Sequence, residues 1–184
     1  MKLSWIPNAI CVFRILLIVP FVGALFAGSY VTALLLIVVA GLSDGIDGFL
    51  ARTFDWRTRL GSLLDPAADK LLMVSAFLSL TRLGLVPLGL TIIIVLRDVV
   101  IVSGALAYQR VAGRLVGEPI LLSKMNTLCQ LCFLVLTIAH AEWALPSPLW
   151  LTLLGAMVVF TSVTSGLAYI LIWSRRAREA AAST

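Results

Sequence analysis

Charged side chains are scarce in this sequence. They make up 12% of its 184 residues, whereas a soluble domain carries roughly 25%. Hydrophobic residues reach 61% of the chain, well above the roughly 45–50% of ordinary globular proteins. Too few polar residues remain to cover a water-facing surface, which excludes a typical soluble domain. We therefore expect an integral membrane protein of the all-α class.

Cysteine and histidine are also rare, with three and one residues in the chain. Cys129 and Cys132 form a single C-x2-C pair, but no second Cys or His pair in the sequence completes a zinc site. Together with Cys11 they lie in apolar stretches, so we interpret all three as helix-packing residues rather than as a disulfide framework. His140 lies at the end of an apolar run, and we assign it no catalytic role.

What the chain does contain is six long apolar runs. Each has about 20 residues, which matches the hydrocarbon thickness of a bilayer. The runs cover residues 8–27, 30–52, 61–81, 86–108, 119–140 and 149–173. We expect six transmembrane helices in a single membrane domain over residues 1–184, a polar loop over 109–118, and a basic tail from about residue 174 that frays. The first run carries Arg14 and lacks a small-residue cleavage site, so we expect a mature helix and not a signal peptide.

The basic residues predict how these helices are oriented. The net charge is +5, and no basic stretch with interleaved aromatics indicates a nucleic-acid partner. Most basic residues at the ends of the runs or outside them fall on one side of the expected membrane: Lys2, Arg52, Arg57, Arg59, Arg110, Arg114, Arg175, Arg176 and Arg178. Only Arg82 falls in a loop on the other side. The positive-inside rule then places both termini in the cytoplasm, and we expect a multi-pass protein of a bacterial inner membrane.

Two pairs of carboxylates stand out in this apolar chain. Asp44 and Asp47 are three residues apart, and Asp65 and Asp69 are four apart. On a helix, either spacing puts both side chains on one face, and a short turn between two such helices would let the pairs face each other. Four adjacent carboxylates repel one another unless cations neutralise them or some hold protons. Hard divalent ions with oxygen ligands, Mg²⁺ above all, are the natural answer.

Small and basic residues accompany these carboxylates. Gly48 and Ala51 leave the helix without bulk, so a large or flat group can approach its backbone. Arg52 supplies a planar cationic fork that suits phosphate. With Gly61 they complete the pattern D-x2-D-G-x2-A-R-x8-G-x3-D-x3-D, which resembles the signature of the CDP-alcohol phosphatidyltransferases.

The resemblance implies a metal-dependent enzyme and assigns roles to residues. An alcohol would attack the lipid-side phosphorus of a CDP-linked lipid, usually CDP-diacylglycerol, with release of CMP. Two divalent cations, Mg²⁺ or Mn²⁺, would be held by Asp44, Asp47, Asp65 and Asp69. Asp69 would also act as the general base. The residues expected to contact the donor are Asn8, Gly48, Ala51, Arg52 and Gly61.

Charged residues inside the runs are expected to face the bundle interior, because charge in hydrocarbon is costly. Arg14 either reaches the lipid headgroups or meets a phosphate in the site, and we favour the phosphate. Neighbouring helical residues point about 100° apart, so we do not expect Arg97 and Asp98 to pair with each other. We favour a polar cavity there over a closed ion-pair network. The residues assigned to the acceptor or its phosphate are Arg14, Lys70, Arg97, Asp98, Lys124 and Asn126.

Two segments beyond the motif bear on the acceptor. Residues 96–101 (Leu-Arg-Asp-Val-Val-Ile) and 123–127 (Ser-Lys-Met-Asn-Thr) look most similar to cardiolipin synthases of the CDP-alcohol type, whose acceptor is phosphatidylglycerol. The related phosphatidylglycerophosphate synthases more often show Arg-Glu and Gly-Lys-x-Lys-Thr there. Glycerol 3-phosphate is dianionic and favours an extra lysine, whereas a phosphodiester carries one charge. Asp98 and Asn126 therefore favour phosphatidylglycerol, with glycerol 3-phosphate as the alternative and serine or inositol phosphate as more distant ones.

Two functions of other classes remain open. A small transporter could use buried charges as a coupling site, although the far halves of the second, third and sixth runs are almost wholly apolar. A non-catalytic scaffold is the other, although the motif is intact. The resemblance also implies a homodimer.

Overall fold

The computed structural model describes residues 5–53, 61–112 and 121–182. Side chains are described throughout these ranges except at residues 5–7, 45, 47–52, 61–65, 105–112, 173 and 175–182. The described ranges form six α-helices, in agreement with the expected all-α class. The helices are α1 (Trp5–Phe26), α2 (Tyr30–Thr53), α3 (Gly61–Arg82), α4 (Leu88–Ala112), α5 (Leu121–Trp143) and α6 (Pro148–Ala182).

The helices group into two compact units. The first comprises Met1–Val86 and Leu134–Pro146, and the second comprises Pro87–Phe133 and Ser147–Thr184. The helix α5 therefore contributes its second part to the first unit and its first part to the second.

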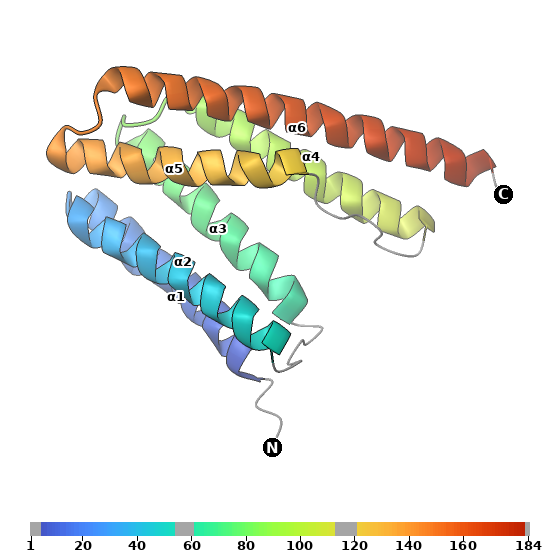
Figure 1. Cartoon of the computed structure of the whole chain (residues 1–184), viewed down its shortest axis with the longest axis horizontal. Helices are drawn as coiled ribbons and strands as arrows, with labels where there is room; N and C mark the ends of the chain where they lie inside the picture. Colours follow the sequence, from blue (N-terminus) through green and yellow to red (C-terminus); the bar gives the residue numbers. More distant parts are fainter. Residues whose placement is uncertain (1–4, 54–60, 113–120, 183–184) are drawn as a thin grey trace. The chain divides into compact units, whose positions relative to one another are not determined.

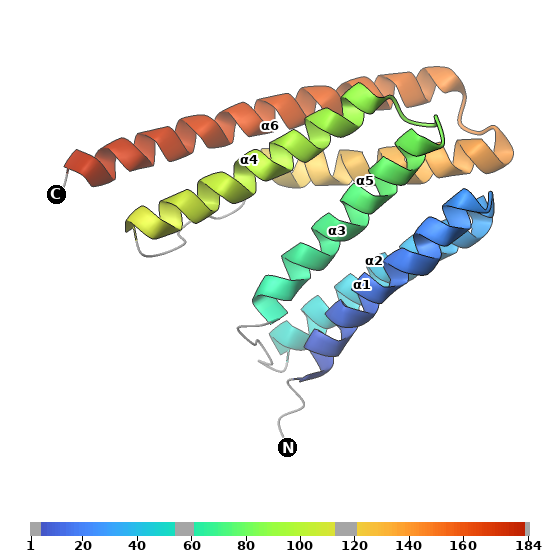
Figure 2. The ribbon, with the colours of Figure 1, turned by 180° about the vertical axis from the view of Figure 1, so that it is seen from behind.

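In the first unit, α1 packs against both α2 and α3, and α1 and α2 run side by side in both views (Figures 1 and 2). The core combines large side chains with alanines, and Phe21, Leu25 and Phe77 are buried together with Ala33 and Ala76. Small residues let helix backbones approach closely, which is how helices pack where the surrounding lipid is as apolar as they are.

A glycine closes the turn between α1 and α2. Gly28 has φ +70°, a left-handed conformation that only glycine adopts without cost. The amide of Ser29 donates to the carbonyl of Ala24 at 2.9 Å, the bond that characterises a Schellman cap. Because the turn is this short, α1 and α2 form an antiparallel hairpin.

In the second unit, α4 packs along α6, and Figures 1 and 2 both show these two helices side by side. Gly155 of α6 marks a close approach: a Cβ added there would lie 3.3 Å from the Phe133 ring and 3.4 Å from Leu90 Cδ1. A larger residue would have to displace these side chains, so Gly155 allows α6 to lie close to both α4 and α5.

Apolar side chains cover the outside of the helices. Leu16 and Val19 of α1 are 63% and 74% exposed, and Phe160 of α6 is 67% exposed. Charged residues such as Arg14 and Arg97 are buried instead. An apolar exterior with the charged side chains enclosed is the arrangement that a bilayer favours. Within the part of the chain that the structure describes, three helical segments are long and apolar enough to cross a membrane: Asn8–Phe26, Leu121–Trp143 and Pro148–Ile172.

Two boundary predictions were wrong. The tail from residue 174 was expected to fray, but α6 continues to Ala182. Its sequence there, Arg-Arg-Ala-Arg-Glu-Ala-Ala-Ala, consists of strong helix formers, so local propensity extends the helix beyond the apolar run. The helix α4 also continues to Ala112, into the stretch assigned to a polar loop. The rest of that loop and the turn at 54–60 lie outside the described residues.

Candidate active site

The antiparallel hairpin of α1 and α2 determines which residues of the two helices lie beside each other. Arg14 and Asp44 lie at nearly equal distances along the chain from Gly28, on either side of the turn. In an antiparallel pair of helices, such positions come to the same height. Asp69 lies in the first half of α3, which packs on α1. The three residues are thereby positioned on three adjacent helices.

Their side chains meet at one nitrogen atom. Arg14 Nη1 lies 2.6 Å from Asp69 Oδ1 and 3.0 Å from Asp44 Oδ1. The Arg14 side chain is 1% exposed, whereas those of Asp44 and Asp69 are 47% and 50% exposed. An enclosed guanidinium therefore contacts two carboxylates, and each carboxylate remains half-exposed. Burial at this level contradicts the alternative that Arg14 reaches the lipid headgroups.

For the other motif residues, the structure describes the position in a helix but not the side chain. Asp47, like Asp44, lies in the second half of α2, and Asp65 precedes Asp69 by one turn of α3. The two helices expected for the motif therefore agree with the described backbone, whereas the turn expected between them lies outside the described residues. The side chains of six residues lie outside the described set: Asp47, Gly48, Ala51, Arg52, Gly61 and Asp65.

The described carboxylates fit a hard divalent cation. The two Oδ1 atoms both lie within 3.0 Å of Arg14 Nη1, so the two carboxylates belong to one site. An all-oxygen donor set suits Mg²⁺ or Mn²⁺. Among the side chains that the structure describes, no three His, Cys, Asp or Glu residues gather into a metal site. Asp47 and Asp65 are not in that set, so the four-aspartate site stays a prediction.

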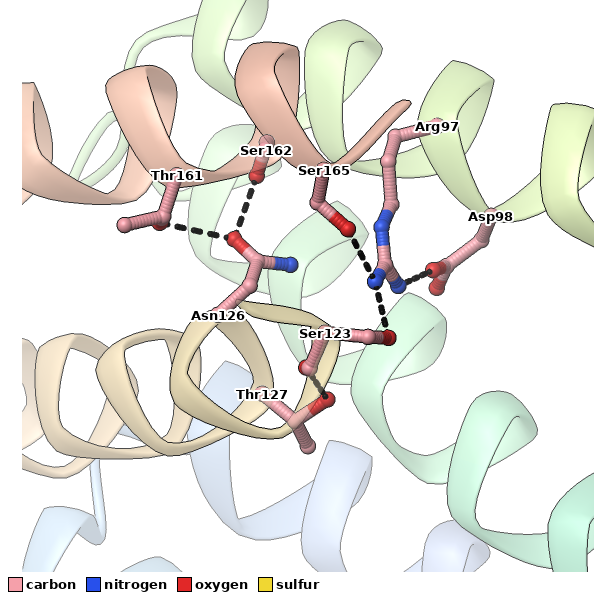
Figure 3. A network of polar contacts seen from close by, with 8 residues as sticks. All are labelled: Arg97, Asp98, Ser123, Asn126, Thr127, Thr161, Ser162 and Ser165. Carbon is pink, nitrogen blue, oxygen red and sulfur yellow. Dashed lines mark hydrogen bonds and ion pairs between the residues drawn. The ribbon is translucent and has the colours of Figure 1, made fainter. Parts of the chain in front are cut away.

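A second polar cluster lies inside the second unit (Figure 3). Arg97 Nη1 donates to Asp98 Oδ1 at 2.7 Å. Arg97 Nη2 donates to Ser123 Oγ of α5 and, at 3.0 Å, to Ser165 Oγ of α6. The guanidinium therefore connects three helices, and Figure 3 shows it between Asp98 and the two serines.

The expectation that Arg97 and Asp98 do not pair was wrong. Their Cα–Cβ bonds do point in different directions, but the arginine side chain is long enough to bring its guanidinium back to the neighbouring carboxylate. Both residues are 6% exposed. A buried charge is tolerated when it is paired and hydrogen-bonded, and this pair meets both conditions.

Asn126 extends the cluster along α5. Its Oδ1 lies 2.9 Å from Thr161 Oγ1 and 2.8 Å from Ser162 Oγ, so the amide is held by two hydroxyls of α6. Its Nδ2 is buried with no hydrogen-bond partner among the described residues, as is the Nε2 of Gln130 one turn further on. Lys124 points outward and is exposed. Within the segment 123–127, the structure therefore brings Asn126 and Ser123 into the cluster and leaves Lys124 on the surface.

For Asn8 and Lys70, the structure shows the helix and the burial of the side chain. Asn8 and Lys70 are half-buried in the first unit, on α1 and α3. Sequence reasoning missed Gln130, although its spacing of four from Asn126 places it on the same helix face. It likewise assigned no site role to Thr161, Ser162 and Ser165. Their intervals of one and three residues on α6 were the available sign of a shared polar face.

Comparison with known proteins adds an independent line of evidence. The family model described as CDP-alcohol phosphatidyltransferase matches residues 4–174. The cardiolipin synthase (CMP-forming) of Homo sapiens is 33% identical over 184 residues, covering 89% of this chain and 60% of that protein. The CDP-diacylglycerol--glycerol-3-phosphate 3-phosphatidyltransferase of Blochmanniella floridana is 27% identical, over 86% of this chain and 83% of that protein.

The extent of these matches differs. The chain spans 60% of the length of the Homo sapiens and Rattus norvegicus cardiolipin synthases. The cardiolipin synthase of Streptomyces coelicolor is 44% identical, but over 66 residues that cover 36% of this chain. The family match itself runs through all six helices and contains the whole aspartate motif. The chain belongs to the CDP-alcohol phosphatidyltransferase family.

Proposed function

We propose that this chain is a phosphatidyltransferase, which moves a phosphatidyl group from CDP-diacylglycerol to a glycerol-type alcohol and releases CMP. The observation that carries this proposal is the meeting of Asp44 and Asp69, from α2 and α3, at one guanidinium nitrogen. It brings together the first and the last aspartate of the motif, whose carboxylates are half-exposed and accessible to a soluble nucleotide.

The motif aspartates are the proposed metal ligands. Asp44, Asp47, Asp65 and Asp69 would hold two divalent cations, Mg²⁺ or Mn²⁺, which polarise the diphosphate and stabilise the departing phosphate when bound. The proposed donor contacts come from Asn8, Gly48, Ala51, Arg52 and Gly61. Arg52 matches the planar geometry of a phosphate, and the two small residues leave room for the nucleotide.

Asp69 is the proposed general base. Its carboxylate takes the proton of the acceptor hydroxyl, and the hydroxyl oxygen forms a bond to the lipid-side phosphorus. The bond between that phosphorus and the oxygen bridging to CMP breaks, and CMP leaves with the bonding electron pair. Asp69 is 50% exposed, which supports access by an acceptor that arrives from the interface.

Phosphatidylglycerol is the acceptor that we favour, which would give cardiolipin. Neutral Asn126 and the Asp98-paired Arg97 leave the second-unit cluster with little net positive charge. This suits a singly charged phosphodiester better than a dianionic phosphate. Names among the relatives support both options, since they include cardiolipin synthases and glycerol-3-phosphate phosphatidyltransferases. The proposed acceptor contacts are Lys70, Arg97, Asp98, Lys124 and Asn126.

The proposed setting is a membrane. The six apolar runs support six spanning helices, as do the three described helices that are long and apolar enough to span. The distribution of basic residues supports both termini and the active site on the cytoplasmic side. A bacterial inner membrane and a homodimer belong to the same proposal. A single catalytic domain is supported by the family match, which runs through both compact units.

Release of CMP tests the class of function. Purified protein in detergent would receive CDP-diacylglycerol, an acceptor lipid, and either Mg²⁺, Mn²⁺ or a chelator. We expect CMP release that depends on both the acceptor and the divalent cation. A transporter or a non-catalytic scaffold would release none, and that result would overturn the proposal.

A further inference from the structure

The Arg14 guanidinium has no role yet in the proposed reaction, although it is the most enclosed charge among the described side chains of the first unit. We propose that Arg14 is a built-in counter-cation of the aspartate motif: it neutralises part of the charge of Asp44 and Asp69 and shares these two carboxylates with the divalent cation. The inference rests on the proposed function, because it assumes that the motif binds metal.

The geometry favours this role over direct contact with a phosphate. Arg14 Nη1 is already within 3.0 Å of both carboxylates, and the side chain is 1% exposed. Asp44 and Asp69 are half-exposed whereas Arg14 is enclosed, so a phosphate arriving from solvent would meet the two carboxylates before it met the guanidinium.

Charge balance explains why a cation is needed at this depth. Three helices converge here, and α2 and α3 each bring a negative group toward α1. Two carboxylates that meet in a partly enclosed site repel each other, and a cation between them turns this repulsion into attraction. Arg14 thus holds α2 and α3 against α1, while the half-exposed oxygens of Asp44 and Asp69 remain available to a metal.

A consequence follows for metal binding. Arg14 and a divalent cation both attract the same oxygens, so each weakens the interaction of the other with the carboxylates. Without Arg14, the stability of the first unit should depend on the metal, and the metal should bind more tightly. A residue with only a packing role would produce neither effect.

The test compares thermal unfolding in EDTA with unfolding in Mg²⁺, for the full chain in detergent. In EDTA, Arg14→Gln should lower the Tm by about 5–10 °C. Mg²⁺ should restore most of this loss, so that its stabilising shift is at least about twice that of the wild type. Arg82→Gln removes the same charge at an exposed position of the same unit and serves as the matched control, with an unchanged Mg²⁺ shift.

Binding of Mn²⁺, followed by electron paramagnetic resonance, supplies a second measurement without catalysis. We expect about tenfold tighter binding by Arg14→Gln, because a unit charge close to the ligand oxygens is removed. Equal Tm losses in EDTA and Mg²⁺, or unchanged or weaker Mn²⁺ binding, would overturn the inference. So would a raised KM for CDP-diacylglycerol with normal metal responses, which indicates a phosphate contact instead.

Two further variants separate charge from folding. Arg14→Lys keeps the charge, so its Tm in EDTA should stay closer to the wild type than that of Arg14→Gln; equal sensitivity to EDTA would contradict the inference. If Arg14→Gln does not fold, adding Asp44→Asn removes one of the two repelling carboxylates and should recover folded protein. Failure of the double variant would also contradict it. Failure of the proposed function can be distinguished from failure of this inference: the wild type would then bind metal normally but release no CMP.

Discussion

Arg14 and Asp69 are 55 residues apart in the sequence and meet through a hydrogen bond of 2.6 Å between Nη1 and Oδ1. This contact links the first helix of the chain to the end of the aspartate motif, and the neighbouring contact with Asp44 links it to the beginning. A residue outside the motif thus organises two of its carboxylates. The chemistry proposed for the site can be tested residue by residue.

Asp69→Asn removes the proposed base while keeping the size of the side chain. We expect kcat to fall by at least about 100-fold, because a positioned general base contributes typically 10²–10⁴-fold. Binding of CDP-diacylglycerol, measured by calorimetry in detergent, should change little. Turnover close to that of the wild type would remove Asp69 as the base, and lost lipid binding would assign it to the donor site.

Asp47→Ala tests the metal site at a ligand whose side chain lies outside the described set. We expect loss of one bound Mn²⁺, counted by equilibrium dialysis, together with loss of activity, because a hard cation needs several oxygen ligands. Asp55→Ala, at an acid outside the motif pattern, should leave the Mn²⁺ count unchanged. Retained metal-dependent activity in Asp47→Ala would contradict the two-metal proposal.

Arg97→Met tests the ion pair buried in the second unit. It leaves Asp98 enclosed without its guanidinium partner, and breaking a buried pair costs about 3–5 kcal/mol. The Tm should therefore fall by about 6–20 °C. The double variant Arg97→Met/Asp98→Leu should be less destabilised than Arg97→Met alone, since no isolated charge remains. Equal losses in the two proteins would show that the pair does not act as a unit.

Asn126→Lys tests the position that separates the two favoured acceptors. Lysine adds a positive charge beside the Arg97 cluster and should raise the ratio of kcat/KM for glycerol 3-phosphate to that for phosphatidylglycerol by about tenfold, because a dianion gains more from it. The Tm should fall, since Asn126 is fully buried between two hydroxyls. Asn126→Leu serves as a control: it loses the same hydrogen bonds without the charge, so its acceptor ratio should stay unchanged. An unshifted ratio in a folded Asn126→Lys would exclude an acceptor role for this position.

The sequence predicted much of the fold because the apolar runs are long and clearly separated. The six expected runs agree with the six described helices, and Gly61 begins α3 as expected. The end of α6 was misjudged because the apolar pattern stops near residue 173, whereas helix propensity continues to Ala182. The apolar run indicates which residues face lipid, whereas the length of the helix also depends on the helix propensity of the residues beyond it.

Contacts within the site were harder to predict than its location. The spacing of Asp44 and Asp69 located the motif, but only the packing of α1 on α2 and α3 reveals Arg14 between them. The pairing of Arg97 with Asp98 depends on side-chain reach, which helix geometry alone does not give. The hydroxyls of α6 gain their meaning only from Asn126 on the facing helix. Such partners are set by tertiary packing, so periodicity along a single helix cannot identify them.

A product assay with two acceptors tests the central claim most directly. Purified wild-type protein in liposomes would receive CDP-diacylglycerol labelled in its phosphatidyl group and Mg²⁺ or Mn²⁺, with phosphatidylglycerol in one reaction and glycerol 3-phosphate in the other. The proposed function predicts that label passes into cardiolipin in the first reaction alone, and that Asp69→Asn abolishes this transfer. Label in phosphatidylglycerophosphate instead would keep the chemistry and contradict the assigned acceptor. No transfer in either reaction, with no CMP released, would contradict the proposed function.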